Sequence, residues 1–313
     1  MNGKRLFHET RDRMKTFLRA DIVHANEGRA KALLSEAFDR ADELIHVINA
    51  WDPASPLAAV NRMAGTGPVI VPRILYDLVE RSLKVCAFTE GRFDITFASM
   101  DRLWYFDRPM ERLPTPAEVK ASVAHVDYRH IRLAPGDTAI HIRNAGTKIE
   151  LGAIGKGFIC EQMKSFLVER GVENGLVNAG GDLVAWGTNE RDEPWTISVM
   201  DPRQPGRVIG RFPITDHAVA TSGDYERFVD LGGERYTHII DPRTGWPVKG
   251  IRSVTVTYPD AELADALCTA VFLNGVRDGL ALIDQVQGLH GFIVDDQGRT
   301  HFSEQFKTIP AIA

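Results

Sequence analysis

The chain has 313 residues, 44% of them hydrophobic, which is enough for one large globular domain or two smaller ones. A total of 37 Lys and Arg against 42 Asp and Glu gives a formal net charge of -5 without a basic block, and this excludes a general nucleic-acid binder. No apolar run looks long enough to span a bilayer, and the first residues show no signal-peptide pattern, so we expect no membrane span and a cytoplasmic location.

The three cysteines are far apart and form no Cys-x-x-Cys pair. Each of Cys86, Cys160 and Cys268 falls inside an apolar helical pattern. The spacing favours buried structural thiols over disulfides or metal ligands, and a reducing compartment.

The first half of the chain mixes helices and short strands. The sequence pattern first predicts a strand at Phe17–Val23, a helix from Glu27 to about Ala50 capped by Asn26, and a helical turn at Ser55–Asn61. A helix from Pro72 to Gly91 and a short helix that begins with a capping box at Thr115 follow. The pattern then predicts a hairpin over Ile131–Ile142 and a strand at Thr147–Leu151.

The second half is richer in strands. The pattern predicts a helix from the Gly152 region to Arg170, then a strand over Gly175–Trp186 that glycines interrupt, and strands at Trp195–Met200 and Arg207–Ile214. A strand ending at Gly223, a hairpin turning at Gly232-Gly233 and a strand at Ser253–Tyr258 come next. The chain finishes with helices at Ala261–Leu273 and Val276–Val286 and a last hairpin turning at Asp295–Gly298.

Many hairpins and few strand–helix–strand units indicate an α+β fold with largely antiparallel sheets. We expect one domain over residues 1–313, with a possible subdivision near 108–115, where the pattern is weakest.

Two short glycine-rich motifs combine chemistry with turns. Gly152–Gly157 stands at a predicted strand-to-helix junction, where a helix N-terminus can bind phosphate. The Walker A spacing fails at Glu150 and Gly157, and the dinucleotide fingerprint fails at Cys160, so either phosphate binding near Lys156 or tight packing remains. Asn178–Asp182 indicates either a β-bulge or a close backbone approach.

Two oxygen-bearing side chains, Asp265 and Thr269, lie four residues apart on one helix face. They could bind a hard cation such as Mg²⁺, or they could mark an exposed helix flank.

The stretch His217–Pro247 carries more ionisable residues than a hairpin needs. Its second strand is expected to carry Tyr236, His238 and Ile240 on one face and to lead into Asp241–Gly245. His238 has no zinc-ligand spacing around it, so a general base or a hydrogen-bonded structural histidine remains.

Taken in order, seven motifs resemble the ApbE-type flavin transferase family over about Met14 to Leu280. The motifs are Ser55…Asn61, Gly91-Arg92-Phe93-Asp94-Ile95-Thr96 with Leu103-Trp104, Leu151–Gly157, Asn178–Asp182, Thr221-Ser222-Gly223-Asp224-Tyr225, His238–Gly245 and Leu263–Ala270.

The resemblance implies a T-fold-like architecture and an FAD:protein FMN transferase. Such an enzyme splits FAD with Mg²⁺, attaches FMN through its phosphate to a threonine of an acceptor flavoprotein, and releases AMP. It further implies that Asp265, Thr269 and the Ala153 carbonyl bind Mg²⁺, that Lys156 faces the diphosphate and that His238 is the base. By the same resemblance, the positions around FAD are Asn61, Gly181, Asp182, Ser222 and Thr244.

This chain departs from the family pattern at two places near the expected site. Glu150 stands where the family usually has Asp, and Ala98-Ser99-Met100 replaces the usual Gly-Pro. Two other activities fit the same motifs: an FAD diphosphatase that gives FMN and AMP, and a non-catalytic FAD-binding protein.

Overall fold

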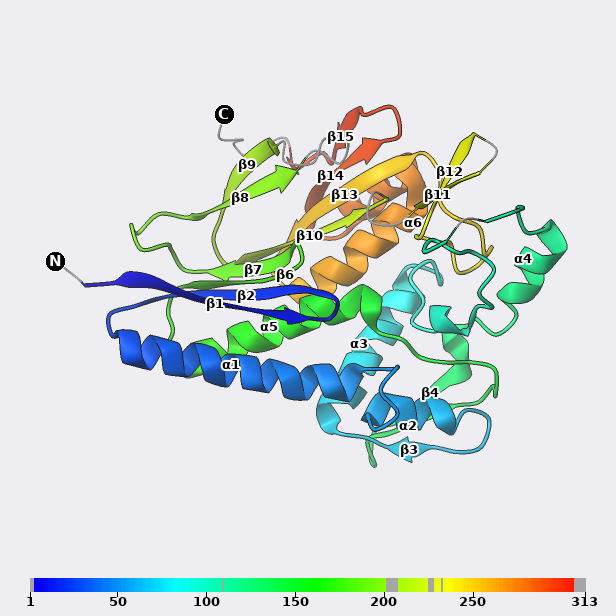
Figure 1. Cartoon of the computed structure of the whole chain (residues 1–313), viewed down its shortest axis with the longest axis horizontal. Coiled ribbons are helices and arrows are strands. Elements are labelled where there is room, and N and C mark those ends of the chain that lie inside the picture. Colours follow the sequence, from blue (N-terminus) through cyan, green and yellow to red (C-terminus); the bar gives the residue numbers. More distant parts are fainter. Residues whose placement is uncertain (1–2, 109, 201–207, 225–227, 232, 307–313) are drawn as a thin grey trace.

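A computed structural model describes residues 3–108, 110–200, 208–224, 228–231 and 233–306. An eight-stranded sheet forms its centre, in the order β1-β2-β6-β7-β10-β13-β14-β15, and each of these neighbouring pairs is antiparallel (Figure 1). The strands are β1 (Arg5–Arg13), β2 (Thr16–His24), β6 (Gly175–Ala179), β7 (Asp182–Trp186), β10 (His217–Gly223), β13 (Ile251–Tyr258), β14 (His290–Asp295) and β15 (Thr300–Phe302).

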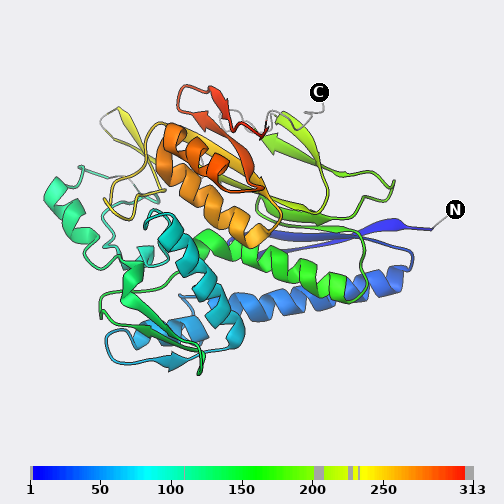
Figure 2. The ribbon, with the colours of Figure 1, turned by 180° about the vertical axis from the view of Figure 1, so that it is seen from behind.

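Both faces of this sheet are covered, so its inner strands are apolar on both sides. Helices α1 (Glu27–Ile48), α5 (Gly152–Glu169) and α6 (Ala261–Gln285) lie on one face, as Figures 1 and 2 show. The hairpin of β8 (Trp195–Met200) and β9 (Val208–Ile214) packs on the other face. Along β7, Val184 and Trp186 join the helix-side core, whereas Leu183 and Ala185 join the hairpin-side core.

The helix boundaries follow from local signals. The Asn26 side chain accepts a hydrogen bond from the Arg29 backbone at 2.9 Å and starts α1. Inside α6, Gly275 has a φ of 78°, which breaks the helix between the two segments that the sequence predicts.

By length and composition alone, α6 is long and apolar enough to cross a membrane, contrary to our expectation from the sequence. It packs against α5, β10 and β13, which is the position of a core helix.

A smaller set of elements lies beyond the ends of α1 and α5. It comprises α2 (Pro56–Arg62), α3 (Arg73–Phe88), the 3₁₀ turns η1 (Phe97–Ser99) and η2 (Tyr128–His130), α4 (Pro116–Ser122), and a sheet of β3 (Val69–Ile70), β5 (Ala139–Ile142) and β4 (Ile131–Ala134). The capping box predicted at Thr115 and Glu118 is present at the start of α4. A separate hairpin joins β11 (Phe228–Leu231) to β12 (Glu234–Thr237).

The structure corrects several sequence predictions. Residues 147–151 form no strand; instead, the backbone of Ile149 bonds to the side chain of Asn61, and that of Lys148 bonds to Ser99. Gly180 and Gly181, both with positive φ, form the two-residue turn of a β6–β7 hairpin rather than a bulge in one strand.

Two further differences concern the site region. The Gly152–Gly157 motif lies inside the first turns of α5, and His238 lies just after the end of β12. Three residues named from the sequence, Tyr225, Gly232 and Arg207, lie outside the described residues. The predicted α+β class with largely antiparallel sheets is confirmed.

Candidate active site

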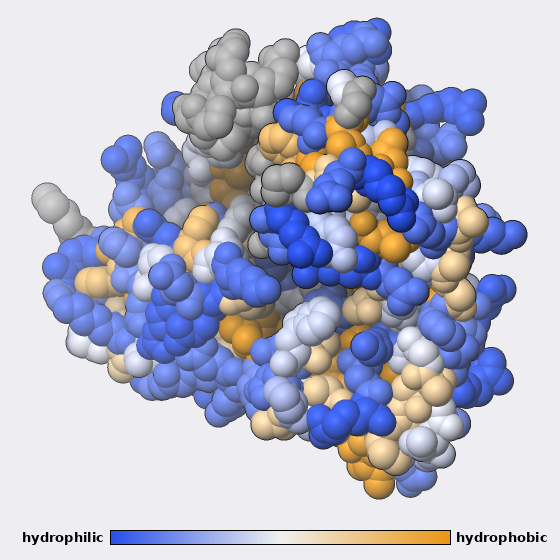
Figure 3. Space-filling view, turned by 45° about the vertical axis from the view of Figure 1, so that its right-hand side comes forward, coloured by the Kyte–Doolittle hydropathy of each residue, from blue (hydrophilic) through white to orange (hydrophobic). Residues whose placement is uncertain are grey.

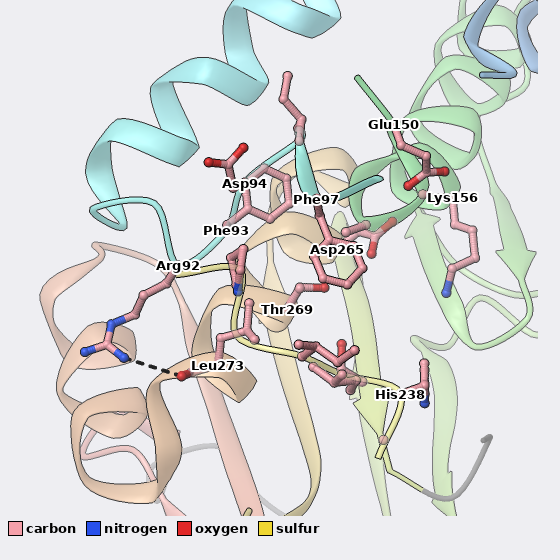
Figure 4. Close-up of a pocket in the computed structure, with 18 of the residues that line it drawn as sticks. Arg92, Phe93, Asp94, Phe97, Glu150, Lys156, His238, Asp265, Thr269 and Leu273 are labelled. Atoms are coloured by element: carbon pink, nitrogen blue, oxygen red, sulfur yellow. Dashed lines mark hydrogen bonds between the residues drawn. The ribbon is translucent and has the colours of Figure 1, made fainter. Parts of the chain in front are cut away.

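A cavity of about 320 Å³ opens where α5, α6 and β10 meet the segments that precede η1 and follow β12 (Figure 4). The surface on this side is largely hydrophilic, with scattered apolar patches and a recess near the middle of the view (Figure 3). Lining residues that matter below are Arg92, Asp94, Phe97, Glu150, Ala153, Lys156, Ser222, His238, Asp265 and Thr269. These residues come from five parts of the chain, so only the folded chain assembles the cavity.

Asp265 and Thr269 both face this cavity from α6, one helical turn apart (Figure 4). The exposed-flank interpretation is wrong for Asp265, whose exposure is 4% because α5 and the sheet cover that side of the helix. Its carboxylate accepts a hydrogen bond from the Gly157 backbone at 3.0 Å. Burial raises the pKa of Asp265, and the nearby charge of Asp182 raises it further.

Lys156 provides the positive charge of this buried cluster. It projects from the second turn of α5 and forms an ion pair with Asp182, a residue that is only 2% exposed. The other carboxylate oxygen of Asp182 accepts a hydrogen bond from the Thr221 backbone at 3.1 Å. The cluster therefore holds two buried carboxylates, Asp182 and Asp265, beside one ammonium group.

Tight packing between two helices explains why the Gly152–Gly157 motif ends in a glycine. A Cβ atom added at Gly157 would lie 2.0 Å from the carbonyl oxygen of Ala261, so glycine lets α5 approach α6 closely. This contact brings Lys156 and Asp265 to one cavity.

Glu150 precedes α5 and lines the cavity. Burial raises the pKa of its carboxyl group, and a hydrogen bond from the Gly152 backbone opposes that rise. The Ala98–Met100 departure lies in η1 and at its end, where the Ser99 hydroxyl accepts a hydrogen bond from the Lys148 backbone at 2.7 Å. This bond connects η1 to the segment that carries Glu150.

His238 is half-buried and lines the same cavity as Asp265 and Thr269. The ring of Phe106 meets its imidazole edge-on, with the ring centroids 6.5 Å apart. His238 enters from the segment after β12, and Figure 4 shows it apart from Lys156 and Glu150.

The structure does not bring every predicted residue to the cavity. Asn61, Gly181, Asp182 and Thr244 are not among the residues that line it. The Asn61 amide forms two hydrogen bonds with the backbone of Ile149, one residue before Glu150. Its Nδ2 donates to the Ile149 carbonyl at 2.9 Å, and its Oδ1 accepts from the Ile149 N–H at 2.7 Å. Gly181 lies in the β6–β7 turn, and Thr244 is exposed in the turn after Pro242.

Two cavity residues were missed as site candidates although their motif was recognised. Asp94 accepts hydrogen bonds from the Thr96 backbone and hydroxyl, at 2.8 and 2.6 Å, and from the Tyr128 backbone at 2.9 Å. Burial raises the pKa of Asp94, although these hydrogen bonds act to lower it. Arg92 donates to the Leu273 carbonyl at 3.5 Å (Figure 4). The run from Gly91 to Thr96 was the available signal.

The donor set suits a hard cation better than zinc. No group of three or more His, Cys, Asp or Glu side chains able to hold a metal occurs among the described residues. Asp265, Thr269 and Ala153 all line the cavity, and the carboxylate and hydroxyl of the first two supply oxygen, the donor type that Mg²⁺ takes. The surplus negative charge of Asp182 and Asp265 over Lys156 favours binding of a cation.

Comparison with known proteins identifies the family of this chain. The model of the ApbE family matches residues 14–293. An FAD:protein FMN transferase of Treponema pallidum is 30% identical over 322 residues, which cover 94% of this chain and 88% of that protein.

Solved structures extend the likeness to the fold. The ApbE protein of Thermotoga maritima matches with a TM-score of 0.88 and 29% identity, covering 97% of this chain and 99% of the other. The flavin transferase ApbE from Vibrio cholerae matches with a TM-score of 0.85 and 27% identity, over 98% and 100% of the two chains. The chain belongs to the ApbE family.

Proposed function

We propose that this chain is an FAD:protein FMN transferase that attaches FMN to a threonine hydroxyl of an acceptor flavoprotein and releases AMP. One observation carries the proposal: Lys156, Asp265, Thr269 and His238 surround one cavity in a chain of this family. We further propose that the protein works in the cytoplasm, which cell fractionation would test.

Lys156 is suited to the diphosphate of FAD. Its ammonium group lies near the start of α5, where the helix dipole also favours negative charge. The ion pair with Asp182 positions Lys156 beside Asp265. Phosphoryl transfer depends mainly on neutralising and aligning the phosphates, so a fixed cation here serves the reaction directly.

Asp265, Thr269 and the Ala153 carbonyl would hold Mg²⁺. When bound, Mg²⁺ supplies positive charge to phosphate oxygens and keeps coordination positions open for them. Asp265 is suited to this role because its burial next to Asp182 leaves its negative charge poorly compensated.

His238 would accept the proton of the acceptor threonine. The threonine oxygen forms a bond to the FMN phosphorus, the bond from that phosphorus to the AMP oxygen breaks, and AMP carries away the bonding electron pair. A hydroxyl is a weak nucleophile, so a positioned base is worth about 10²- to 10⁴-fold in rate. Phe106, packed edge-on, restricts the imidazole.

The decisive experiment is mass spectrometry of candidate flavoproteins co-expressed with this chain. We expect one FMN added to a threonine, and chromatography of the purified reaction should show AMP. Asp265→Ala and His238→Ala should both lose transfer. Asp278→Ala, a change at an exposed position on the same helix as Asp265, should retain it.

Four outcomes would change the proposal. Fast release of free FMN that an acceptor does not accelerate indicates an FAD diphosphatase. Intact FAD after long incubation with Mg²⁺ and competent acceptors indicates a non-catalytic flavin-binding protein. Full transfer by Asp265→Ala removes the metal assignment, and full transfer by His238→Ala removes the base assignment.

A further inference from the structure

A groove of about 450 Å³ lies on an arm of the molecule next to the active site. The arm consists of the described residues of 102–122, which run from just after η1 to the end of α4. Figures 1 and 2 show α4 and the β11–β12 hairpin side by side at one end of the molecule. The groove and the active-site cavity have no lining residue in common, so they are separate recesses.

A small apolar core attaches this arm to the segment that carries His238. Trp104 stacks on Tyr236, with the ring centroids 5.3 Å apart, and its indole N–H donates to the Gly245 carbonyl at 2.9 Å. The ring of Phe106 meets the His238 imidazole edge-on. Because the contacts fall on both sides of His238 along the chain, the arm has a fixed position relative to the proposed base.

Arg108 is a cation on this arm whose position is fixed while its charge is not neutralised. Its guanidinium carbon lies 3.8 Å from the centroid of the Tyr105 ring. Such a cation–π contact orients the group and leaves its N–H donors at the edge available. The adjacent carboxylate, Asp107, pairs with Arg102 at 2.7 Å. Within the described parts of the chain, no carboxylate forms an ion pair with Arg108.

The charges of the groove suit one additional carboxylate. Its lining carries three arginines, Arg102, Arg108 and Arg112, and two glutamates, Glu111 and Glu118. Arg112 and Glu118 neutralise each other through two hydrogen bonds, at 2.9 and 2.7 Å. A guanidinium group binds a carboxylate through two parallel N–H donors. A phosphate or a nucleic acid brings more negative charge and would be repelled by Glu111.

The rest of the lining resembles a protein interface. It consists of Leu103, Tyr105, Met110 and Pro114, and Leu113 is exposed beside it. Tyr, Met and Arg are the side chains that protein–protein interfaces favour over the remaining surface. A fixed cation among apolar side chains therefore fits a protein surface that presents a carboxylate.

We propose that this groove is a docking surface for the acceptor flavoprotein, and that Arg108 pairs with a carboxylate of the acceptor while the target threonine reaches His238. The inference rests on the proposed function, which requires a second protein to approach His238. The groove holds a part of the acceptor other than the threonine. A standard interface covers about 800 Å² of each partner, so one acceptor surface can span the groove and the mouth of the cavity.

A binding experiment tests the groove without transfer. The probe is the acceptor identified by mass spectrometry with its target threonine changed to valine, and its Kd is measured by isothermal titration calorimetry. We expect Arg108→Glu to raise this Kd about 10-fold or more, because repulsion replaces attraction. Added salt should weaken binding to the wild type more than binding to Arg108→Gln, since salt screens the ion pair.

The matched control is Arg5→Glu, which makes the same change of charge. Arg5 is also an exposed arginine next to an aromatic ring, 5.1 Å from the centroid of Phe7. It begins β1, whose start lies at the opposite end of the molecule from α4 (Figures 1 and 2). Its Kd for the acceptor should stay close to that of the wild type.

A kinetic experiment with the unmodified acceptor separates docking from chemistry. Arg108→Glu should raise the KM for the acceptor by the same factor as the Kd, while kcat at saturating acceptor and the Kd for FAD stay unchanged. Changing the matching acceptor carboxylate to arginine should restore binding to Arg108→Glu and weaken binding to the wild type, as a reversed ion pair requires.

The outcomes separate this inference from the proposed function. If transfer is intact and Arg108→Glu changes neither the Kd nor the KM for the acceptor, only the groove assignment fails. An equal loss in Arg5→Glu, or a fall in kcat or in FAD affinity in Arg108→Glu, also overturns it. If the wild-type chain transfers FMN to no protein, the proposed function fails and the acceptor assignment of the groove fails with it.

Discussion

Asp265 is the residue at which stability and function are most opposed. It is buried beside Asp182, and Lys156 alone compensates the pair in the cluster described above. We expect Asp265→Asn to raise the free energy of unfolding of the metal-free protein by about 1–2 kcal/mol, because it removes a poorly solvated charge. The same variant should lose transfer.

Urea unfolding in the presence of EDTA measures this gain. Thr269→Val is the matched control, since it removes a proposed oxygen ligand from the same helix face without removing charge. It should lose transfer and show no gain in stability. A metal-free Asp265→Asn protein less stable than the wild type would show that the carboxylate is stabilised by the fold.

His290 gives the protein a pH-dependent stability outside the site. Its Nδ1 is buried without a hydrogen-bond partner in the described part of the chain, and burial, followed by the neighbouring His217, lowers its pKa. Between the lowered pKa and the unfolded value of about 6.5, the unfolded chain binds more protons. Stability should therefore fall as the pH drops below about 6.5.

Unfolding midpoints measured between pH 8 and pH 5 check this. His290→Gln should flatten the acid-side loss, whereas His8→Gln, at an exposed position on β1, should leave it close to the wild-type curve. Equal curves for His290→Gln and the wild type would assign the acid sensitivity to other groups.

The sequence predicted the chemistry of single residues better than their surroundings. It singled out Lys156, His238, Asp265 and Thr269, which the fold brings to one cavity. It could not show that Asp265 is buried, because that depends on α5 and the sheet covering the α6 face. Asp94 was missed because the sequence does not reveal that this carboxylate is buried and held by hydrogen bonds from the backbones of Thr96 and Tyr128.

At the scale of elements, the contact between α5 and α6 sets the geometry of the site. We expect Gly157→Ala to destabilise the protein by about 1–3 kcal/mol or more, because the added methyl would overlap the Ala261 carbonyl. Any separation of the helices also moves Lys156 away from Asp265, so transfer should fall more than stability alone explains.

Thermal unfolding and FAD binding measure the two effects. Gly136→Ala is the control, since a Cβ atom there meets nothing within 4 Å. It should be close to neutral. A Gly157→Ala protein with wild-type stability would mean that the helices can separate without loss.

Elements with local signals were predicted well. The Asn26 cap, the Thr115 capping box and the Gly275 break each act within one turn, so the sequence contains them in full. Strand β1 was missed because it is a charged edge strand whose Arg11 and Arg13 pair with Asp39 and Asp42 of α1. The failed strand at Thr147–Leu151 has side chains of distant residues as its hydrogen-bond partners, which no local pattern reveals.

At the scale of the whole molecule, sheet order determines which motifs meet. The strand sequence β7-β10-β13 places Asp182 beside Thr221, and it places Asp224 beside Arg252. Part of the active-site cavity is then formed by the end of β10 and by the segment that follows β12. The sequence indicated antiparallel sheets in general, but the pairing of strands about 40 residues apart is a tertiary property.

Because the site draws on the whole fold, ligands should stabilise the whole molecule. A ligand at about 100 times its Kd adds about 2.7 kcal/mol to the free energy of unfolding. FAD and Mg²⁺ share the phosphate oxygens in the proposed function, so each should tighten the other's binding by the same factor. The shift in the unfolding midpoint with both ligands should therefore exceed the sum of the two separate shifts.

Differential scanning calorimetry of four samples tests this coupling: no ligand, FAD, Mg²⁺, and both. In Asp265→Asn the FAD shift should persist and the extra shift should vanish, because the flavin contacts remain while the charged metal ligand is gone. If the midpoint shifts of FAD and Mg²⁺ simply add in the wild type, the metal does not bind next to the diphosphate of FAD. Coupling retained in Asp265→Asn would show that the charge of the Asp265 carboxylate is not needed to hold the metal, and would remove the assignment of that carboxylate as the charged metal ligand.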